Sequence, residues 1–246
     1  MAVSIKFGAF DFQGSVERYD IRQSPRLKQI VVPRRDGART EVASLGALVI
    51  SVSGQIHAST QAALRTQFDN LKSSLLKRKD QLTLFDDRFV EAQVRSYGDT
   101  FVPGSGMLSA RYDVGFLADL PFLQSIALNQ DVQTVAVSPT TFPITIGGNA
   151  DTRPVIRIEN TSGADIVNNI RIENLTTGKA SVYIGTLLKD KTLLIDMLNR
   201  DVLNDNVSDL NSFQGQFWEL KQALNQLKYT GGVTVKITTE WRDLFF

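Results

Sequence analysis

The sequence predicts a mainly β protein with one long helix, and three patterns support that prediction. Residues 3–12 alternate apolar and polar side chains, which is typical of a half-buried strand. Residues 59–79 have a helical period instead, and short strand-like segments fill the second half of the chain. The order of these patterns indicates two domains. The first is a β domain, either barrel-like or a sandwich, with one helix packed against it, and the second is a β-sandwich of the jelly-roll type.

A hairpin is predicted in the first third of the chain. Residues 30–32 form a short apolar strand, and Pro33 then removes a backbone donor. The Asp36-Gly37 step that follows tolerates the positive φ of a tight turn. Strand-like composition resumes over residues 42–53, so the two segments are expected to be the arms of one hairpin.

The helical period of residues 59–79 predicts a helix of about five turns. Its apolar stripe consists of Leu64, Phe68, Leu71 and Leu75. Ser59 or Thr60 can cap the start of this helix. Three cations lie where the negative end of the helix dipole favours them, at Lys77, Arg78 and Lys79.

Strand patterns return after the helix. A hairpin is predicted around Asp86-Asp87, with residues 82–85 and 89–94 as its arms. A further strand is predicted where apolar and polar side chains alternate, over residues 110–116. The pattern is then lost from about residue 124 to the Ser138-Pro139 step, which predicts a linker with a boundary near residues 125–138. We therefore predict two domains, residues 1–133 and 134–246.

The second domain is predicted to be rich in strands. Residues 155–160 and 170–174 share an Ile-Arg-Ile-Glu-Asn motif, which indicates two similar half-buried strands. Further strands are expected over residues 180–187, 192–197 and 232–241. Between residues 217 and 229 the apolar spacing is near-helical, so a helix is expected there, with a loop or a strand as alternatives.

The composition of the chain excludes several classes of function. Lys and Arg number 27 against 26 Asp and Glu, and the formal charge of +1 gives no general attraction to nucleic acid or to an anionic membrane. The chain has no cysteine, which excludes disulfides, Cys-ligated metals and thiol nucleophiles. We expect no signal peptide and no membrane insertion, because no long apolar segment occurs.

No catalytic group of residues is indicated. His57 is the single histidine, and it lacks a second metal ligand or a nucleophile nearby in the sequence. The carboxylates at Asp86-Asp87 suit a hairpin tip, and those of Asp201, Asp205 and Asp209 suit a solvated loop without the glycine and glutamate of a calcium-binding loop. We therefore predict no catalytic, cofactor-binding or metal-binding residues, and a protein that is not an enzyme.

The order of the segments resembles one known family. The segments that carry the resemblance are residues 30–37, the helix at 59–79, Leu84-Phe85-Asp86-Asp87-Arg88, Tyr112-Asp113-Val114-Gly115-Phe116, Asp119-Leu120-Pro121-Phe122, Ile158-Glu159-Asn160, Asn174-Leu175-Thr176-Thr177-Gly178, Leu193-Leu194-Ile195-Asp196 and Val235-Lys236-Ile237-Thr238. In this order they are similar to the distal tail proteins of siphoviruses, the phages with long non-contractile tails. The resemblance covers almost the whole chain.

The resemblance implies a structural protein of the virion. Such proteins form a homo-hexameric ring that joins the tail tube protein to the tail-associated hub or fibre protein of the tip. Phage DNA passes through the ring without specific binding, and the carboxyl-terminal domain is a galectin-like sandwich. Assembly would take place in the host cytoplasm. Arg34, Arg35 and Asp36 then become candidate intersubunit contacts, because basic residues cluster around the hairpin without the interleaved aromatics of a nucleic-acid binder.

Two other functions are alternatives to the role of a ring-forming structural protein. A carbohydrate-binding module that contributes to adhesion on the host cell wall is the alternative, with Tyr183, Trp218 and Tyr229 as candidate sugar-facing aromatics. Burial habits favour core positions for the same side chains. An enzyme such as a glycosidase would rest on scattered carboxylates alone, and no motif supports it.

Overall fold

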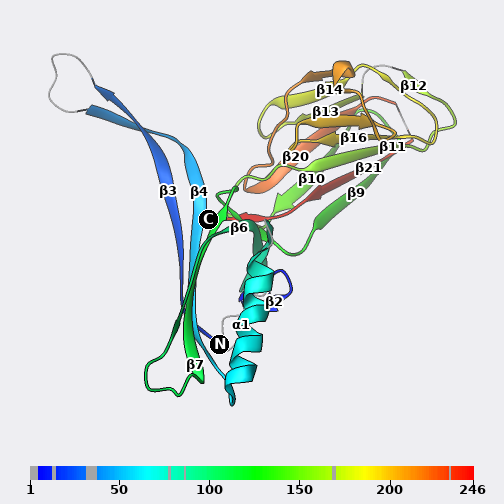
Figure 1. Ribbon diagram of the computed structural model, residues 1–246. Helices are drawn as coiled ribbons and strands as arrows, with labels where there is room; N and C mark the ends of the chain where they lie inside the picture. The colour runs from blue at the N-terminus through cyan, green and yellow to red at the C-terminus, as the bar shows by residue number, and fades with distance from the viewer. Residues whose placement is uncertain are drawn as a thin grey trace. The chain divides into compact units, whose positions relative to one another are not determined.

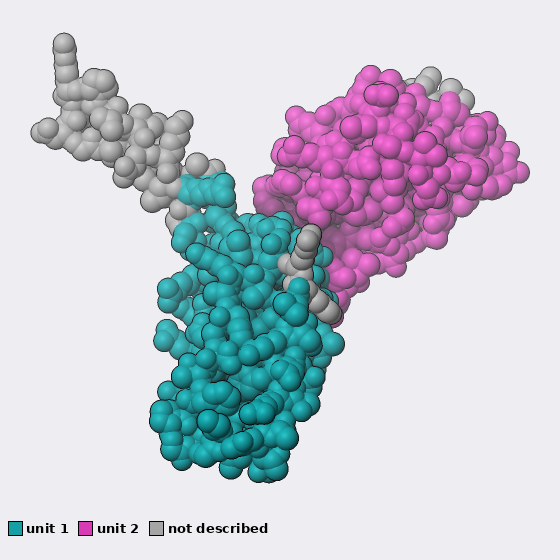
Figure 2. Space-filling view, viewed as in Figure 1, with its two compact units in different colours: residues 1–124 teal, residues 125–246 magenta. Residues whose placement is uncertain are grey.

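The structure is a computed structural model that describes residues 5–12, 15–31, 38–76, 79–85, 87–167, 170–232 and 234–246. The chain divides into two compact units, Met1–Gln124 and Ser125–Phe246 (Figure 2). Antiparallel strands make up most of both units, and α1 (Gln61–Leu75) is the single α-helix of the described residues. The predicted class, mainly β with one long helix, is confirmed.

Unit 1 is built around one antiparallel sheet with the strand order β2-β1-β5-β6-β7-β4-β3 (Figure 1). Its strands are β1 (Ile5–Phe7), β2 (Phe10–Asp11), β3 (Val16–Val31), β4 (Ala38–His57), β5 (Asp80–Leu84), β6 (Arg88–Phe101) and β7 (Ser109–Ala118). A short strand, β8 (Leu123–Ser125), lies at the boundary of the two units.

The first predicted strand is divided in two. A turn at Gly8, whose φ is 56°, separates β1 from β2, and the two strands pair with each other. Glycine adopts this left-handed backbone without the steric cost that a side chain would add. The alternation of residues 3–12 therefore contains a tight turn that the period alone did not reveal.

The helix follows its prediction closely. The Thr60 hydroxyl accepts a 3.1 Å hydrogen bond from the Ala63 amide and caps the first turn. All four residues of the predicted stripe are buried, from Leu64 to Leu75. The helix ends at Leu75, before Lys79, and Lys77 and Arg78 lie outside the described residues.

The core of unit 1 lies between this helix and the sheet. The rings of Phe7 and Phe116 pack with centroids 4.9 Å apart, and those of Phe12 and Tyr112 are 5.7 Å apart. The same alternation that predicted β7 places Tyr112, Val114 and Phe116 inside. One face of the sheet is therefore apolar and packed, and the other is polar.

Unit 2 contains two larger antiparallel sheets and a small one. The first has the order β10-β20-β13-β14-β19, the second β18-β17-β16-β11-β21-β9, and the third pairs β12 with β15. The strands are β9 (Asn129–Val135), β10 (Thr140–Ile146), β11 (Val155–Asn160), β12 (Ile166–Val167), β13 (Ile170–Asn174), β14 (Lys179–Tyr183), β15 (Thr186–Leu187), β16 (Thr192–Asp196), β17 (Asp201–Asn204), β18 (Val207–Ser208), β19 (Phe213–Gly215), β20 (Ala223–Thr230), β21 (Val235–Trp241) and β22 (Leu244–Phe245), with a short 3-10 helix, η1 (Leu210–Ser212).

The two larger sheets share one apolar core, which gives the unit the character of a β-sandwich. The two Ile-Arg-Ile-Glu-Asn strands lie in different sheets, β11 in one and β13 in the other. Each motif ends in a buried asparagine, Asn160 or Asn174, whose side-chain amide donates to backbone carbonyls. The repeated motif therefore reflects two strands with the same pattern of burial.

The helix expected over residues 217–229 is wrong. Residues 223–230 form β20, which pairs with β10 and β13 in the middle of its sheet. Leu227 and Tyr229 face the core from alternate positions. The strand alternative is the correct one for this part of the segment.

The division between the units lies nine residues before the predicted boundary at residue 133. Residues expected to form the linker include β9, which pairs along its whole length with β21, from Asn129 opposite Trp241 to Val135 opposite Val235. This pairing makes the segment part of unit 2. Its mostly polar sequence follows from its position at the edge of the sheet.

Replacing Thr239 by valine is expected to raise the free energy of unfolding by about 1 kcal/mol. Thr239 is fully buried, and its hydroxyl has no hydrogen-bond partner among the described residues. Valine has almost the same shape and removes the unsatisfied hydroxyl. Urea denaturation monitored by fluorescence measures the change.

Thr152→Val is the matched control, because the buried hydroxyl of Thr152 donates a 2.8 Å hydrogen bond to the Arg242 carbonyl. That variant is expected to lose stability. If both variants lost the same free energy of unfolding, the Thr239 hydroxyl would have a hydrogen-bond partner in solution.

Candidate functional site

The most unusual element of unit 1 is the pair β3 and β4, which are 16 and 20 residues long. The two strands pair from Val16 opposite Gly54 to Val31 opposite Ala38, which confirms the predicted hairpin and greatly lengthens it. Strand β4 pairs with β7 only between Leu48 and His57. Among the described strands, residues 38–47 therefore pair with β3 alone and form a two-stranded ribbon that projects from the sheet (Figure 1).

A protruding ribbon of this kind receives little stabilisation from the rest of its own chain. Two-stranded ribbons are marginally stable in water, and their free edges are templates for pairing with another chain. The pairing of β3 and β4 shifts register twice close to Pro25. The Ser24 carbonyl lies close to the backbone of Gly46, which has no side chain to obstruct it. A Cβ atom at position 46 would lie 2.6 Å from that carbonyl oxygen.

The ribbon is strongly basic. Between positions 26 and 41 it has two acidic residues, Asp36 and Glu41, and five basic ones, namely Arg26, Lys28, Arg34, Arg35 and Arg39. The predicted contacts Arg34, Arg35 and Asp36 fall within residues 32–37, which lie outside the described residues. Their role as intersubunit contacts stays a prediction.

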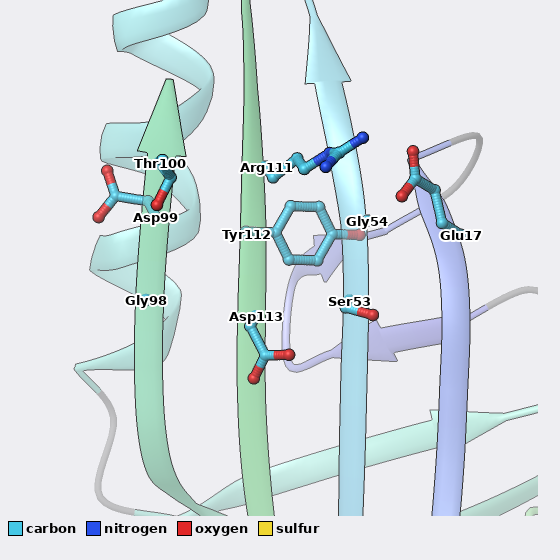
Figure 3. A pocket seen from close by; sticks show the side chains of 9 residues that line it. All are labelled: Glu17, Ser53, Gly54, Gly98, Asp99, Thr100, Arg111, Tyr112 and Asp113. Carbon is cyan, nitrogen blue, oxygen red and sulfur yellow. The ribbon is translucent and has the colours of Figure 1, made fainter. Parts of the chain in front are cut away.

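A hollow of about 440 Å³ lies on unit 1, at the end of the long strands away from the turn. Four strands contribute to its lining (Figure 3). The lining residues are Glu17, Ser53, Gly54, Gly98, Asp99, Thr100, Arg111, Tyr112 and Asp113. Figure 3 shows the Arg111 side chain extending from β7 across β4, with Glu17 of β3 turned toward it.

The backbone of β4 at Gly54 fixes the geometry of this hollow. A Cβ atom at position 54 would lie 1.8 Å from the Ser15 carbonyl oxygen and 2.6 Å from the Tyr112 hydroxyl, so only glycine fits. The Tyr112 and Ser15 hydroxyls are 2.9 Å apart and hydrogen-bonded. Burial raises the pKa of Tyr112 to about 12, so its hydroxyl stays protonated at neutral pH. A register shift between Val16 and Arg18 places Glu17 at the rim.

The lining has three carboxylates and one guanidinium. Asp99 lies 3.4 Å from the Lys72 ammonium group, which also sits 5.7 Å from the centre of the Tyr97 ring. Glu17 and Asp113 have no basic side chain within ion-pair distance in the described part of the chain. Both carboxylates face solvent beside Arg111, so the hollow has an excess of negative charge.

The three aromatics considered for a sugar site lie inside unit 2. Tyr183, Trp218 and Tyr229 each have no exposed surface, which corrects the expectation that they face a ligand. Tyr183 donates a 2.6 Å hydrogen bond to Asp209, and Tyr229 donates a 3.0 Å hydrogen bond to the Gly232 carbonyl. Their polar groups serve the packing of the core.

His57 lies on the surface, and Asp205 and Asp209 pair with neighbouring side chains. His57 is exposed at the end of β4, opposite Ser109. Asp205 pairs with Lys191 at 2.6 Å, and Asp209 accepts from Tyr183. Within the described ranges, no group of three metal-ligating side chains could hold a metal ion, and no helix is long and apolar enough to cross a membrane.

The interaction between Tyr183 and Asp209 predicts a pH-dependent stability. Hydrogen bonds from Tyr183 and Ser212 lower the pKa of Asp209, so the stability they add is present above the ordinary aspartate pKa and is lost as the pH falls through the lowered value. Tyr183→Phe is expected to cost about 1.5 kcal/mol at neutral pH and less in acid.

Urea denaturation at several pH values measures this difference. Tyr229→Phe is the matched control, because its hydroxyl bonds a neutral carbonyl and its loss should cost the same throughout the acid range. A Tyr183→Phe penalty that does not shrink as the pH falls would contradict the assignment.

Comparisons with known proteins agree with this architecture. Residues 147–245 match the family model described as the siphovirus-type tail component, C-terminal domain. The crystal structure of phage SPP1 Dit, described as a paradigm of the hub adsorption apparatus of phages that infect Gram-positive bacteria, covers all of this chain and all of its own at a TM-score of 0.77 and 16% identity. Residues 147–245 are therefore similar to the C-terminal domain of siphovirus-type tail components, and the whole chain shares the fold of SPP1 Dit.

A second structure shares the fold more loosely. A chain from the baseplate of phage p2, in the activated conformation with Sr, aligns over 98% of both chains at a TM-score of 0.50 and 10% identity. The search of curated proteins finds no match. The family that the order of segments resembles is the one to which residues 147–245 and the fold are similar.

Proposed function

We propose that the chain is the adaptor of the tail tip, a structural and non-enzymatic protein that forms a hexameric ring between the tail tube protein and the hub or fibre protein below. The ring would leave a channel through which DNA passes without specific binding. Assembly would take place in the host cytoplasm before the ring becomes part of the virion.

The protruding β3–β4 ribbon supports the proposal. Residues 38–47 have backbone groups on one edge that no described strand of the same chain uses, and a neighbouring subunit would cover them. The resemblance to tail and baseplate proteins in fold supports the same role. Carbohydrate binding is not proposed as a second function, because the aromatics that suggested it lie in the core.

Electron microscopy and light scattering of the purified protein test the proposal together. Rings with six-fold symmetry and a hexameric mass are the expected result. A strict monomer at every concentration would contradict it, and closed rings of another subunit number would contradict the hexamer alone.

A further inference from the structure

We propose that the loop between β6 and β7, residues 101–108, is a docking surface for another protein of the tail, one unlike this chain. That partner offers a shallow apolar socket to each copy of the loop. The inference rests on the proposed adaptor function and extends it by naming one of the surfaces through which the adaptor contacts its neighbours.

The loop exposes apolar side chains and carries no charge. Phe101, Met107 and Leu108 are 48%, 56% and 38% exposed, and residues 100–110 contain no charged side chain. Together the exposed side chains present on the order of 300 Å² of apolar surface, which is the size of the largest patch on a typical monomer. Patches of this size are often functional, so the loop is a candidate contact surface.

Hydrogen bonds fix the backbone of the loop. The Val102 amide donates to the Ser109 carbonyl at 3.0 Å, and the Ser105 amide and hydroxyl donate to the Val102 carbonyl at 3.3 and 2.8 Å. The Leu108 amide donates to the Ser105 carbonyl at 3.1 Å. Met107 has a φ of 61°, which residues with a side chain rarely adopt. A preorganised turn therefore displays the apolar side chains, and this lowers the entropy that binding costs.

The loop lies at the end of unit 1 away from the ribbon (Figure 1). The Ala58 amide, just after β4, donates to the Leu108 carbonyl at 2.9 Å, and the Gln61 side chain of α1 donates to the Gly106 carbonyl at 3.2 Å. The ribbon includes the other end of β4, at Ala38, roughly 60 Å of strand away. Unit 1 therefore has two unlike ends, one basic and one apolar.

Another copy of the chain does not fit the loop. The ribbon of a second copy is basic, and the loop offers it no carboxylate. Loop-to-loop pairing would bury on the order of 300 Å² from each copy, against roughly 800 Å² from each partner in a stable interface. Two rings joined by like ends would present the same outer end twice, whereas an adaptor between unlike proteins needs two different ends. An unlike protein that contacts several loops of one ring gains affinity from each.

A membrane suits the loop less well than a protein does. Residues 100–110 contain no Lys or Arg to attract anionic lipids, and no Trp or Tyr, the side chains enriched at membrane interfaces. The fixed backbone suits a socket of matching shape, which a protein provides and a fluid bilayer does not.

Phe101→Ser/Met107→Ser tests the surface in the intact virion. In a phage that encodes this chain, the double change is expected to lower the yield of infectious particles at least about tenfold, because the lost contact repeats in every copy of the ring. The purified variant is expected to form rings like the wild type. Val207→Ser is the matched control, since Val207 is 69% exposed on unit 2, and it should leave the yield unchanged.

Photo-crosslinking identifies the occupant of the loop. Benzoylphenylalanine in place of Phe101 keeps an aromatic side chain there, and irradiated virions are expected to give a covalent product of this chain with an unlike tail protein. The chain has no cysteine, so Met107→Cys and Gly163→Cys each introduce a single thiol. A maleimide should label position 107 in the purified ring and not in the virion. It should label position 163 in both, because a Cβ atom there meets nothing within 4 Å.

The outcomes separate this inference from the proposed function. A thiol at position 107 that stays equally reactive in the virion overturns the docking surface and leaves the adaptor role standing. A crosslinked product of two copies of the chain, or the loss of rings in Phe101→Ser/Met107→Ser, assigns the loop to self-assembly and overturns it as well. Wild-type protein that floats with phosphatidylglycerol vesicles, and a double variant that does not, overturn it in favour of a membrane. A wild-type chain that neither forms rings nor enters the virion overturns both proposals.

Discussion

Replacing residues 26–44 by the dipeptide Asn-Gly is expected to yield a folded protein that no longer assembles. Pro25 and Leu45 are paired across the ribbon, so a two-residue turn can join them without disturbing the rest of β3 and β4. The change removes most of the basic residues of the ribbon and the strand edges that pair with no other described strand. Size-exclusion chromatography with light scattering should report a monomer at concentrations where the wild type is a ring.

Stability separates a loss of assembly from a loss of folding. The deleted part of β4 pairs with β3 alone, so the free energy of unfolding of a dissociated subunit should change little. Arg34→Glu/Arg35→Glu keeps the ribbon at full length and serves as the companion variant. Rings formed by the shortened protein would show that subunits meet elsewhere.

The length of this ribbon was not predictable from hydrophobic period. The sequence indicated a strand over residues 30–32, whereas β3 begins at Val16. Much of the segment is charged or polar, as at Glu17, Arg18 and Asp20, since this edge strand has a solvated face. None of the described side chains of β3 is buried, so the strand lacks the alternation that a packed sheet imposes.

The prediction of a helix near residue 220 was wrong for a related reason. Leu220 and Leu227 are both buried, but Leu220 belongs to an isolated bridge with Thr152, and Leu227 belongs to β20. Asn225 occupies a core-facing position of β20, where its amide donates to the Lys221 carbonyl. This buried polar residue interrupts the apolar alternation that would have indicated a strand.

The helix and β7 were predictable because each packs one face against a core of its own unit. The hollow was not, because Glu17, Gly98 and Asp113 come from three strands that only the sheet register brings together.

Gly54→Ala is expected to destabilise unit 1 by about 3 kcal/mol, the upper end of the usual cost of overpacking. The added Cβ would lie 1.8 Å from the Ser15 carbonyl oxygen, which is backbone and cannot rotate away. Relief requires β3 to move from β4, which breaks the 2.8 Å hydrogen bond from the Gln55 amide to the same carbonyl. Urea denaturation of the two-unit protein, with the transition of each unit assigned separately, measures the loss.

Gly98→Ala is the matched control, because it adds the same methyl group to a neighbouring part of the hollow where nothing lies within 4 Å. That variant should fold with nearly wild-type stability. A loss below about 1 kcal/mol for Gly54→Ala would mean that β3 and β4 separate there at little cost, since overpacking against fixed backbone is otherwise expensive. The base of the ribbon would then be too loose to hold Glu17 in place at the rim of the hollow.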